Sequence, residues 1–320
     1  VADSSALAEQ LVGDVLLSAF DSAGQRCSAL RLLCIQEDGA DRVVDMIKQA
    51  MREWVMGNPD RMHTDVGPVI DEKAQTQIEQ HIVRMQAQGQ PVTRMARDES
   101  AVKGHFVMPA LMEIDRIDRL QREVFGPVLH VLRYRREQLG ELLDAINSTG
   151  YGLTFGVHSR IDETIAQVTK KVMAGNVYVN RNVIGAVVGV QPFGGMGLSG
   201  TGPKAGGPLY LYRLLQAGKS QGNQALAALP NMPMNPTQST HMQVNPAAQP
   251  TLLSLQSLCA ALADPAFHLL AGWQHNDTAK ALAACESYCA LSVLGQLFTL
   301  PGTTGEANRY QLLPRGVIYV

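Results

Sequence analysis

The sequence predicts an α/β fold built around a mostly parallel sheet. Along residues 1–180, short apolar runs with the length of strands alternate with longer segments whose apolar residues recur every three or four positions. This alternation is typical of parallel sheets, because two parallel strands need a crossover connection between them. The chain length fits about two domains.

The first predicted helix covers residues 4–18, where apolar side chains recur at helical spacing behind Asp3 and Ser4, two candidate N-caps. This helix leads into a glycine-containing loop. Residues 31–35 then form a short apolar strand. We therefore expect Cys34 to lie in the core as a packing residue.

The next two predicted helices are amphipathic. The apolar stripe over residues 43–55 includes Trp54, which we expect in the core, and Gly-Asn-Pro at 57–59 ends this helix. A second stripe covers residues 78–85. His81 lies beside that stripe and has no acidic or cysteine partner at metal-ligand spacing, so we expect a surface or capping histidine.

Strands and helices continue to alternate further along the chain. Residues 106–112 and 124–132 are predicted strands, separated by a charged connection at 115–119 that we expect to be solvated. Predicted helices and strands then follow in turn at 139–146, 153–157, 161–173 and 177–179.

The composition changes in the second half of the chain. Residues 185–208 are a glycine-rich coil, which indicates a backbone that closely approaches a ligand or a neighbouring strand. Residues 216–250 are rich in Pro, Gln and Asn and predict an extended linker. Residues 251–320 predict the beginning of a further α/β domain, with helices over 252–262 and 277–297 and a strand at 312–320.

Charge and cysteine content exclude several classes of protein. The net charge of -2 offers no basic patch for nucleic acid or for an anionic membrane surface. No apolar run reaches the roughly 18 residues of a membrane span, and no secretory leader is recognisable. The five cysteines include no C-x-x-C pair, so we expect neither disulfides nor a metal centre. A cytoplasmic location is expected.

Cys27 is the candidate nucleophile, in the stretch F-D-S-A-G-Q-R-C-S at residues 20–28. A thiolate attacks carbonyl carbon, so a catalytic cysteine needs a polar and partly open setting. Gly24 allows a tight turn, Arg26 adds a neighbouring cation, and Ser28 supplies a hydroxyl and a backbone N–H. The alternative is that Cys27 is a small buried apolar residue, as most free cysteines are.

Three stretches in this order resemble the aldehyde dehydrogenase superfamily. The pattern F-x-x-x-G-Q-x-C-S at 20–28 resembles its active-site cysteine motif, and E-V-F-G-P-V at 123–128 and Q-P-F-G-G at 191–195 fit the same family. Residues 175–182 and 185–207 narrow the resemblance to the L-glutamate γ-semialdehyde dehydrogenase module of the proline utilization A family. Residues 300–306 resemble, less specifically, the start of the extra C-terminal domain of its longer members.

This resemblance implies a reaction and a cofactor. Residues 1–215 would form the catalytic domain of the aldehyde dehydrogenase fold, which oxidises L-glutamate γ-semialdehyde to L-glutamate with NAD during proline catabolism. Cys27 would form a hemithioacetal and then a thioester. Glu123 would hold the hydroxyls of the nicotinamide ribose, and Phe125 would pack beside the nicotinamide. FAD would belong only to a proline dehydrogenase module outside this chain.

The resemblance also implies a site for the charged end of the aldehyde substrate. A purely apolar tunnel could not desolvate an α-carboxylate without a large energetic cost. Ser28 is a candidate because it directly follows the nucleophile, and the backbone N–H groups of Gly185 and Ala186 match the family's aldehyde-anchoring loop. The alternative is that residues 185–189 form only a flexible turn and Ser28 only caps a helix. Phe193 matches an aromatic residue that packs on the aliphatic stem, and Arg26 is a more distant candidate cation.

Several parts of the whole enzyme are missing from the sequence. We find no nucleotide-binding βαβ region, no oxyanion-hole asparagine and no glutamate in an E-[LT]-G-G stretch to activate water, and we expect each upstream of Val1. We therefore expect residues 1–215 and 251–320 to be truncated domains, an inactive isolated chain, and a homo-oligomer in the full-length enzyme. Two alternatives remain open: a dehydrogenase for another aldehyde, and a non-catalytic scaffold.

Overall fold

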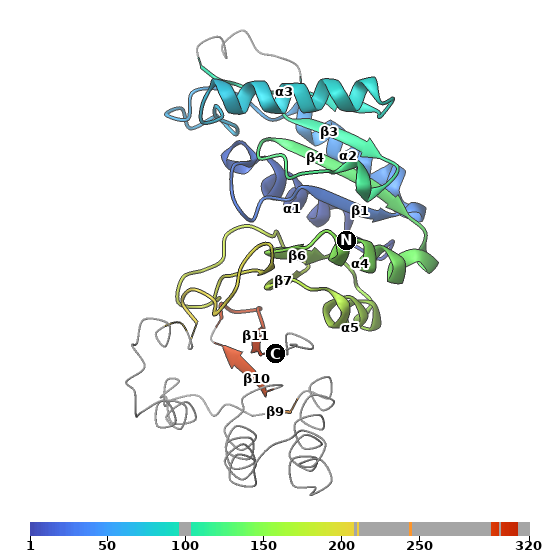
Figure 1. The fold of residues 1–320 in the computed structure, drawn as a ribbon, viewed down its shortest axis with the longest axis vertical. Helices are drawn as coiled ribbons and strands as arrows, with labels where there is room; N and C mark the ends of the chain where they lie inside the picture. Colours follow the sequence, from blue (N-terminus) through green and yellow to red (C-terminus); the bar gives the residue numbers. More distant parts are fainter. Residues whose placement is uncertain (96–103, 208–209, 211–242, 245–295, 301, 313–320) are drawn as a thin grey trace, which may run out of the picture. The chain divides into compact units, whose positions relative to one another are not determined.

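The computed structural model describes residues 1–95, 104–207, 210, 243–244, 296–300 and 302–312 (Figure 1). The chain divides into two compact units. The first unit comprises residues 1–186 and 193–205, and the second comprises residues 187–192 and 206–320. Among the described residues, no helix is long and apolar enough to cross a membrane.

A four-stranded sheet with the order β1-β4-β3-β2 forms the centre of the first unit. The strands are β1 (Leu32–Gln36), β4 (Val128–Tyr134), β3 (Ala110–Ile114) and β2 (Val92–Arg94). The β1/β4 and β4/β3 pairs are parallel, and only β2 runs antiparallel to its neighbour. The mostly parallel α/β sheet expected from the sequence is therefore confirmed.

Prolines set the beginnings of two of these strands. The sequence predicted strands from residues 106 and 124, but β3 begins at Ala110 and β4 at Val128, each directly after a proline. Pro109 and Pro127 have no N–H to donate to a strand ladder, so regular pairing starts at the next residue. The carbonyl of Pro127 still accepts a bond from the Ala110 N–H at 3.0 Å.

A second, smaller sheet continues the first through the N-terminal residues. It pairs β6 (Thr154–Val157) in parallel with β7 (Asn176–Val179). Ala2 forms parallel bridges with both Ile35 and His158, and its N–H donates to the Cys34 carbonyl at 2.8 Å. The first residues of the chain thus lie between β1 and β6 and join the two sheets (Figure 1).

Five α-helices of the described part of the first unit pack around these sheets. They are α1 (Ala8–Phe20), α2 (Glu37–Arg52), α3 (Glu72–Ala87), α4 (Leu139–Ser148) and α5 (Asp162–Lys171). Short 3-10 turns lie at η1 (Asp21–Gly24), η3 (Ile117–Arg119) and η4 (Arg136–Gln138). The helices correspond to the five predicted from apolar periodicity in this part of the chain, with shifted ends.

Two details of the helix predictions are corrected by the structure. Helix α1 begins at Ala8, and neither Asp3 nor Ser4 caps it. The carboxylate of Asp3 instead accepts bonds from the hydroxyls of Ser5 at 2.6 Å and Ser159 at 2.5 Å, so it fastens the N-terminal segment to a distant loop. Trp54 lies beyond the end of α2, yet it packs against the core, as expected, with its ring centroid 6.1 Å from that of Phe20.

His81 is buried, so the expectation of a surface or capping histidine is wrong. Its side of α3 also carries the buried Ile78, Ile82 and Met85. A polar ring can be buried there because His130 of β4 lies across from it, with 2.8 Å between the two Nε2 atoms. That partner is 49 residues away in the sequence and therefore outside any local pattern.

Few residues of the second unit are described. Its strands β9 (Gln243–Val244), β10 (Gln296–Leu300) and β11 (Asn308–Gln311) form an antiparallel sheet with the order β11-β10-β9. The helix predicted over 277–297 is wrong at its last two residues, which belong to β10. The remainder of that helix, the helix at 252–262, the strand at 313–320 and most of the 216–250 linker lie outside the described residues.

Candidate active site

The loop that carries Cys27 begins with a left-handed backbone turn. Helix α1 ends at Phe20, and the φ angles of Ser22, Ala23 and Gly24 are then 56°, 54° and 62°. Residues other than glycine rarely adopt this region, and each such residue costs about 1–3 kcal/mol unless its surroundings fix it. Contacts outside the loop must therefore hold this conformation.

One such contact joins the backbones of two glycines. A Cβ atom added to Gly24 would lie 2.1 Å from the Gly126 carbonyl oxygen and 2.8 Å from that of Ala19. Gly126 is itself confined, because a Cβ there would lie 2.3 Å from the Cδ1 atom of Ile78. Two residues without side chains thus let the Cys27 loop lie directly against the segment 123–127.

Cys27 is exposed at the tip of a tight turn. The turn is closed by the Ala29 N–H, which donates to the Arg26 carbonyl at 3.1 Å. The alternative of a small buried cysteine is therefore excluded for Cys27, whereas it holds for Cys34, whose burial raises its thiol pKa to about 11. A thiol in this exposed position can reach a dissolved carbonyl compound, which a nucleophile requires.

Arg26, the cation next to Cys27 in the sequence, makes its described side-chain contacts with other residues of the loop. Arg26 pairs with the Asp21 carboxylate at 3.0 Å and donates from Nε to the Ser22 hydroxyl at 2.8 Å. Its guanidinium therefore supports the left-handed turn. Neither the sulfur of Cys27 nor the hydroxyl of Ser28 is among its described contacts.

Arg31 is the residue that the sequence reasoning missed. Its guanidinium donates to the carbonyls of Gly24 at 2.6 Å and Arg26 at 3.0 Å, so it holds the Cys27 loop from within. Its Nε pairs with Glu123 at 3.1 Å, and the group lies 4.8 Å from the ring centroid of Phe125. The available signal was a charged residue at the start of an otherwise apolar strand, where burial needs such partners.

Burial and nearby anions act on Arg31 in opposite directions. Desolvation lowers the pKa of its guanidinium, while the carboxylate of Glu123 and the sulfur of Cys27 raise it. Arginine stays charged in either case. It therefore places a permanent positive charge beside the loop that carries Cys27.

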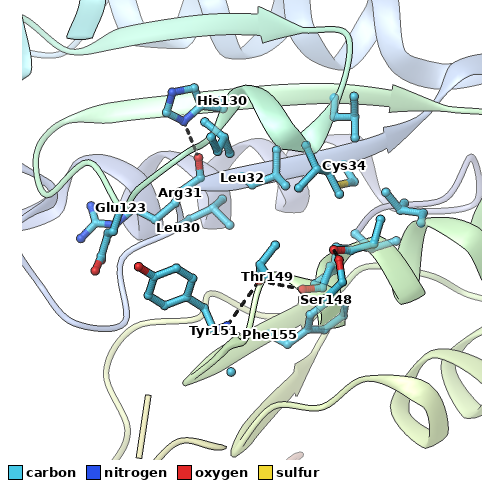
Figure 2. A pocket seen from close by; sticks show the side chains of 18 of the residues that line it. Leu30, Arg31, Leu32, Cys34, Glu123, His130, Ser148, Thr149, Tyr151 and Phe155 are labelled. Carbon is cyan, nitrogen blue, oxygen red and sulfur yellow. Dashed lines mark hydrogen bonds and ion pairs between the residues drawn. The ribbon is translucent and has the colours of Figure 1, made fainter. Parts of the chain in front are cut away.

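A cavity of about 1040 Å³ opens beside these residues (Figure 2). Cys27, Arg31, Glu123 and Phe125 line it, together with apolar side chains of β1, α4 and β6. Figure 2 shows Leu30 and Leu32 on one side of this cavity and Thr149, Tyr151 and Phe155 on the other. The nucleophile and both cofactor candidates predicted from the sequence thus share one cavity.

The four candidates for substrate binding are placed differently. Ser28 is buried behind Cys27, and its carbonyl accepts a bond from the Thr154 hydroxyl at 3.4 Å. Gly185 has a φ of 75° and open space around it, Ala186 follows it, and Phe193 exchanges backbone bonds with Ala205. None of the four lines the cavity described above, although Val183 does.

Candidate metal ligands do not gather anywhere in the described part of the chain. No group of three or more His, Cys, Asp or Glu side chains is arranged there to hold an ion. The exposed Cys27, the charge of Arg31 and the cavity together favour nucleophilic chemistry on an uncharged electrophile such as a carbonyl.

A comparison with family models decides which family this arrangement represents. Residues 1–218 match the model of the aldehyde dehydrogenase family. The chain belongs to this family. Members generally use NAD or NADP and act on aldehydes. The mostly parallel α/β arrangement of the first unit is accordingly the aldehyde dehydrogenase fold.

Individual relatives are similar over two thirds or more of the chain. The bifunctional protein PutA of Salmonella typhimurium is 52% identical over 325 residues, which cover 98% of this chain and 23% of that protein. A 1-pyrroline-5-carboxylate dehydrogenase of a Geobacillus species is 37% identical over 219 residues, covering 68% of this chain and 42% of its own length. The chain therefore spans about a quarter of the PutA protein that it matches.

Solved structures of similar proteins also superimpose on this chain. A crystal structure of bifunctional proline utilization A superimposes with a TM-score of 0.64 at 56% identity, covering 66% of this chain and 21% of that one. The structure of a 1-pyrroline-5-carboxylate dehydrogenase superimposes with a TM-score of 0.61 at 32% identity, covering 67% of this chain and 41% of that one.

Proposed function

We propose that this chain is part of an NAD-dependent dehydrogenase that oxidises L-glutamate γ-semialdehyde to L-glutamate in proline catabolism. The observation that carries the proposal is the exposed Cys27 held against residues 123–127 by Arg31 and by the contact between Gly24 and Gly126. Support comes from the relatives, which are named bifunctional protein PutA and 1-pyrroline-5-carboxylate dehydrogenase.

In the proposed reaction the Cys27 thiolate attacks the aldehyde carbon, and the carbonyl π electrons move to oxygen as a hemithioacetal oxyanion. The backbone N–H of Cys27 is a candidate donor to that oxygen. A nicotinamide held by Glu123 and Phe125 would supply a hydride acceptor for the hydrogen on the same carbon, and Cys27 would then carry a thioester. Water then adds to the thioester and releases the carboxylic acid and the thiol.

The residues present fit a nicotinamide cofactor. Glu123 and Phe125 are both exposed on the cavity that contains Cys27, one as a carboxylate acceptor and the other as an aromatic face. The ion pair with Arg31 uses Oε1 of Glu123. Its second oxygen has no partner among the described contacts and can accept a bond from a ribose hydroxyl.

Replacing Glu123 with glutamine tests the cofactor role. The substitution keeps the shape of the side chain but removes the charge that a ribose hydroxyl and Arg31 would share. We expect hydride transfer at saturating NAD to slow roughly ten- to a hundredfold, as loss of a hydrogen bond to a charged group costs about 1.5–3 kcal/mol. Single-turnover NADH formation measures this rate, and an unchanged rate would remove Glu123 from the cofactor site.

The substrate itself distinguishes this proposal from another aldehyde dehydrogenase. Ser28, Gly185, Ala186 and Phe193 remain the proposed contacts for the amino-acid end. Replacing Ser28 with alanine is expected to raise the KM for L-glutamate γ-semialdehyde roughly tenfold or more, by removing a hydrogen bond to the carboxylate. The KM for propionaldehyde, which has no carboxylate, should stay the same.

Comparing the two substrates within one Ser28→Ala preparation controls for changes in folding. Equal increases in both KM values would show that Ser28 maintains the loop and does not contact the carboxylate. The non-catalytic scaffold would be favoured by two results together. The wild-type protein would oxidise neither aldehyde, and alkylation would show Cys27 to be no more reactive than an ordinary thiol. We further propose a cytoplasmic enzyme that forms a homo-oligomer as the full-length protein.

A further inference from the structure

Two buried histidines connect α3 to the loop that carries Cys27. The Nε2 atoms of His81 and His130 lie 2.8 Å apart, and the two rings meet edge to face. The Nδ1 atom of His81 lies 2.7 Å from a guanidinium nitrogen of Arg84. On the other side, Nδ1 of His130 lies 2.9 Å from the carbonyl oxygen of Arg31 (Figure 2).

The partners at the two ends determine where every proton lies. Arg84 can only donate, so Nδ1 of His81 accepts and its Nε2 carries the proton. That proton is donated to Nε2 of His130, which leaves the proton of His130 on Nδ1. The carbonyl of Arg31 can only accept, so it completes the series. All bonds are satisfied with both rings neutral.

The surroundings keep both rings neutral. Burial, followed by the effects of His130, Arg84 and Arg122, lowers the pKa of His81 to about 3. Burial also lowers the pKa of His130 to about 4, although its bond to the Arg31 carbonyl acts in the opposite direction. A proton added to either ring would face the cations Arg84, Arg122 and Arg31 and would break a hydrogen bond.

This series of hydrogen bonds ends at Arg31, the residue that holds the loop of Cys27. The Arg31 carbonyl accepts from both the backbone N–H of His130 at 3.0 Å and its Nδ1, while the guanidinium holds the carbonyls of Gly24 and Arg26. We propose that His130, whose tautomer is set by His81, positions the Cys27 loop, because the bond from its Nδ1 fixes Arg31 at the point where β1 begins. His130 is thus a positioning residue, and the inference rests on the proposed role of Cys27.

Sheet pairing alone is the competing explanation for the same contacts. The ladder between β1 and β4 already pairs Leu32 with His130, so a purely structural histidine would affect stability without changing the loop. The positioning role makes a different prediction. Displacing Arg31 would remove a positive charge from the neighbourhood of the attacking thiolate, so the reactivity of Cys27 would fall in a protein that remains folded.

Two variants of His130 separate its two hydrogen bonds. Asparagine places its amide nitrogen near the position of Nδ1 and can keep the bond to Arg31, whereas glutamine reaches the position of Nε2 and keeps the contact with His81. The full-length protein would be treated with iodoacetamide at pH 7.5, and peptide mass spectrometry would follow each cysteine separately. Cys34, which is buried, reports unfolding in the same sample.

We expect Cys27 in His130→Gln to react roughly tenfold more slowly than in the wild type, the change expected from loss of one hydrogen bond, with Cys34 still protected. In His130→Asn the Cys27 rate should stay close to the wild-type rate. Equal Cys27 rates in the two variants, or a wild-type rate in His130→Gln, would overturn the proposal. Alkylation needs no cofactor or turnover, so this result is independent of whether the proposed dehydrogenase activity is found.

Discussion

Replacement of Cys27 with alanine is expected to lower the dehydrogenase activity of the full-length protein by at least about 10⁴-fold, the scale on which enzymes lose activity with their covalent nucleophile. No other described cysteine can substitute, because Cys34 is buried. NAD binding should remain, since Glu123 and Phe125 are untouched. NADH formation measures the first quantity, and titration of NAD by protein fluorescence measures the second.

The matched control is Cys34→Ala. This thiol is buried in β1, and burial raises its pKa to about 11, so it stays protonated and does not act as a nucleophile. We expect its removal to lower stability by about 1–2 kcal/mol through lost packing and to leave the activity per folded molecule unchanged. Substantial turnover by Cys27→Ala would exclude the covalent mechanism.

Replacement of Gly24 with alanine is expected to destabilise the first unit by about 3 kcal/mol or more, since a left-handed non-glycine residue and a backbone collision add together. The added Cβ would lie 2.1 Å from the Gly126 carbonyl oxygen, and neither backbone can move without releasing the loop. Denaturant unfolding followed by circular dichroism would measure the change. The alkylation rate of Cys27 should change in the same variant, because the loop must shift.

Gly13→Ala is the matched control for that substitution. Gly13 lies within α1, and a Cβ there would meet no atom within 4 Å. The same chemical change should therefore stabilise the protein by about 0.5–1 kcal/mol, because alanine is the better helix former. If Gly24→Ala proved as stable as Gly13→Ala, the close contact between Gly24 and Gly126 would not exist in solution.

Local patterns predicted most of the first unit. Apolar residues at helical spacing identified α1 to α5, and short apolar runs identified β1, β3, β4, β6 and β7. Burial on one face imposes these periods directly on the sequence, so they can be read without the structure. The order of three motifs also predicted the family and the nucleophile, which the match over residues 1–218 confirms for the family.

Helix and strand ends were less well predicted, because they depend on single groups. Pro109 and Pro127 delay β3 and β4, and the carboxylate of Asp3 bonds with Ser159 and does not cap α1. At the two strands the missing N–H of one proline sets the first residue of regular pairing. The Asp3 carboxylate has two possible partners, and Ser159, 156 residues away, decides between them.

What the sequence by itself determined was the succession of elements and the reactive side chain, since both follow from residue type and spacing. Only the tertiary structure decided which arginine holds the loop of Cys27 and shares its cavity. Arg26 is adjacent in sequence but pairs with Asp21, whereas Arg31 reaches Glu123, 92 residues away. Likewise, His81 is buried because His130 lies opposite it. A buried polar group is stable only with a partner, and chain folding alone brings such partners together.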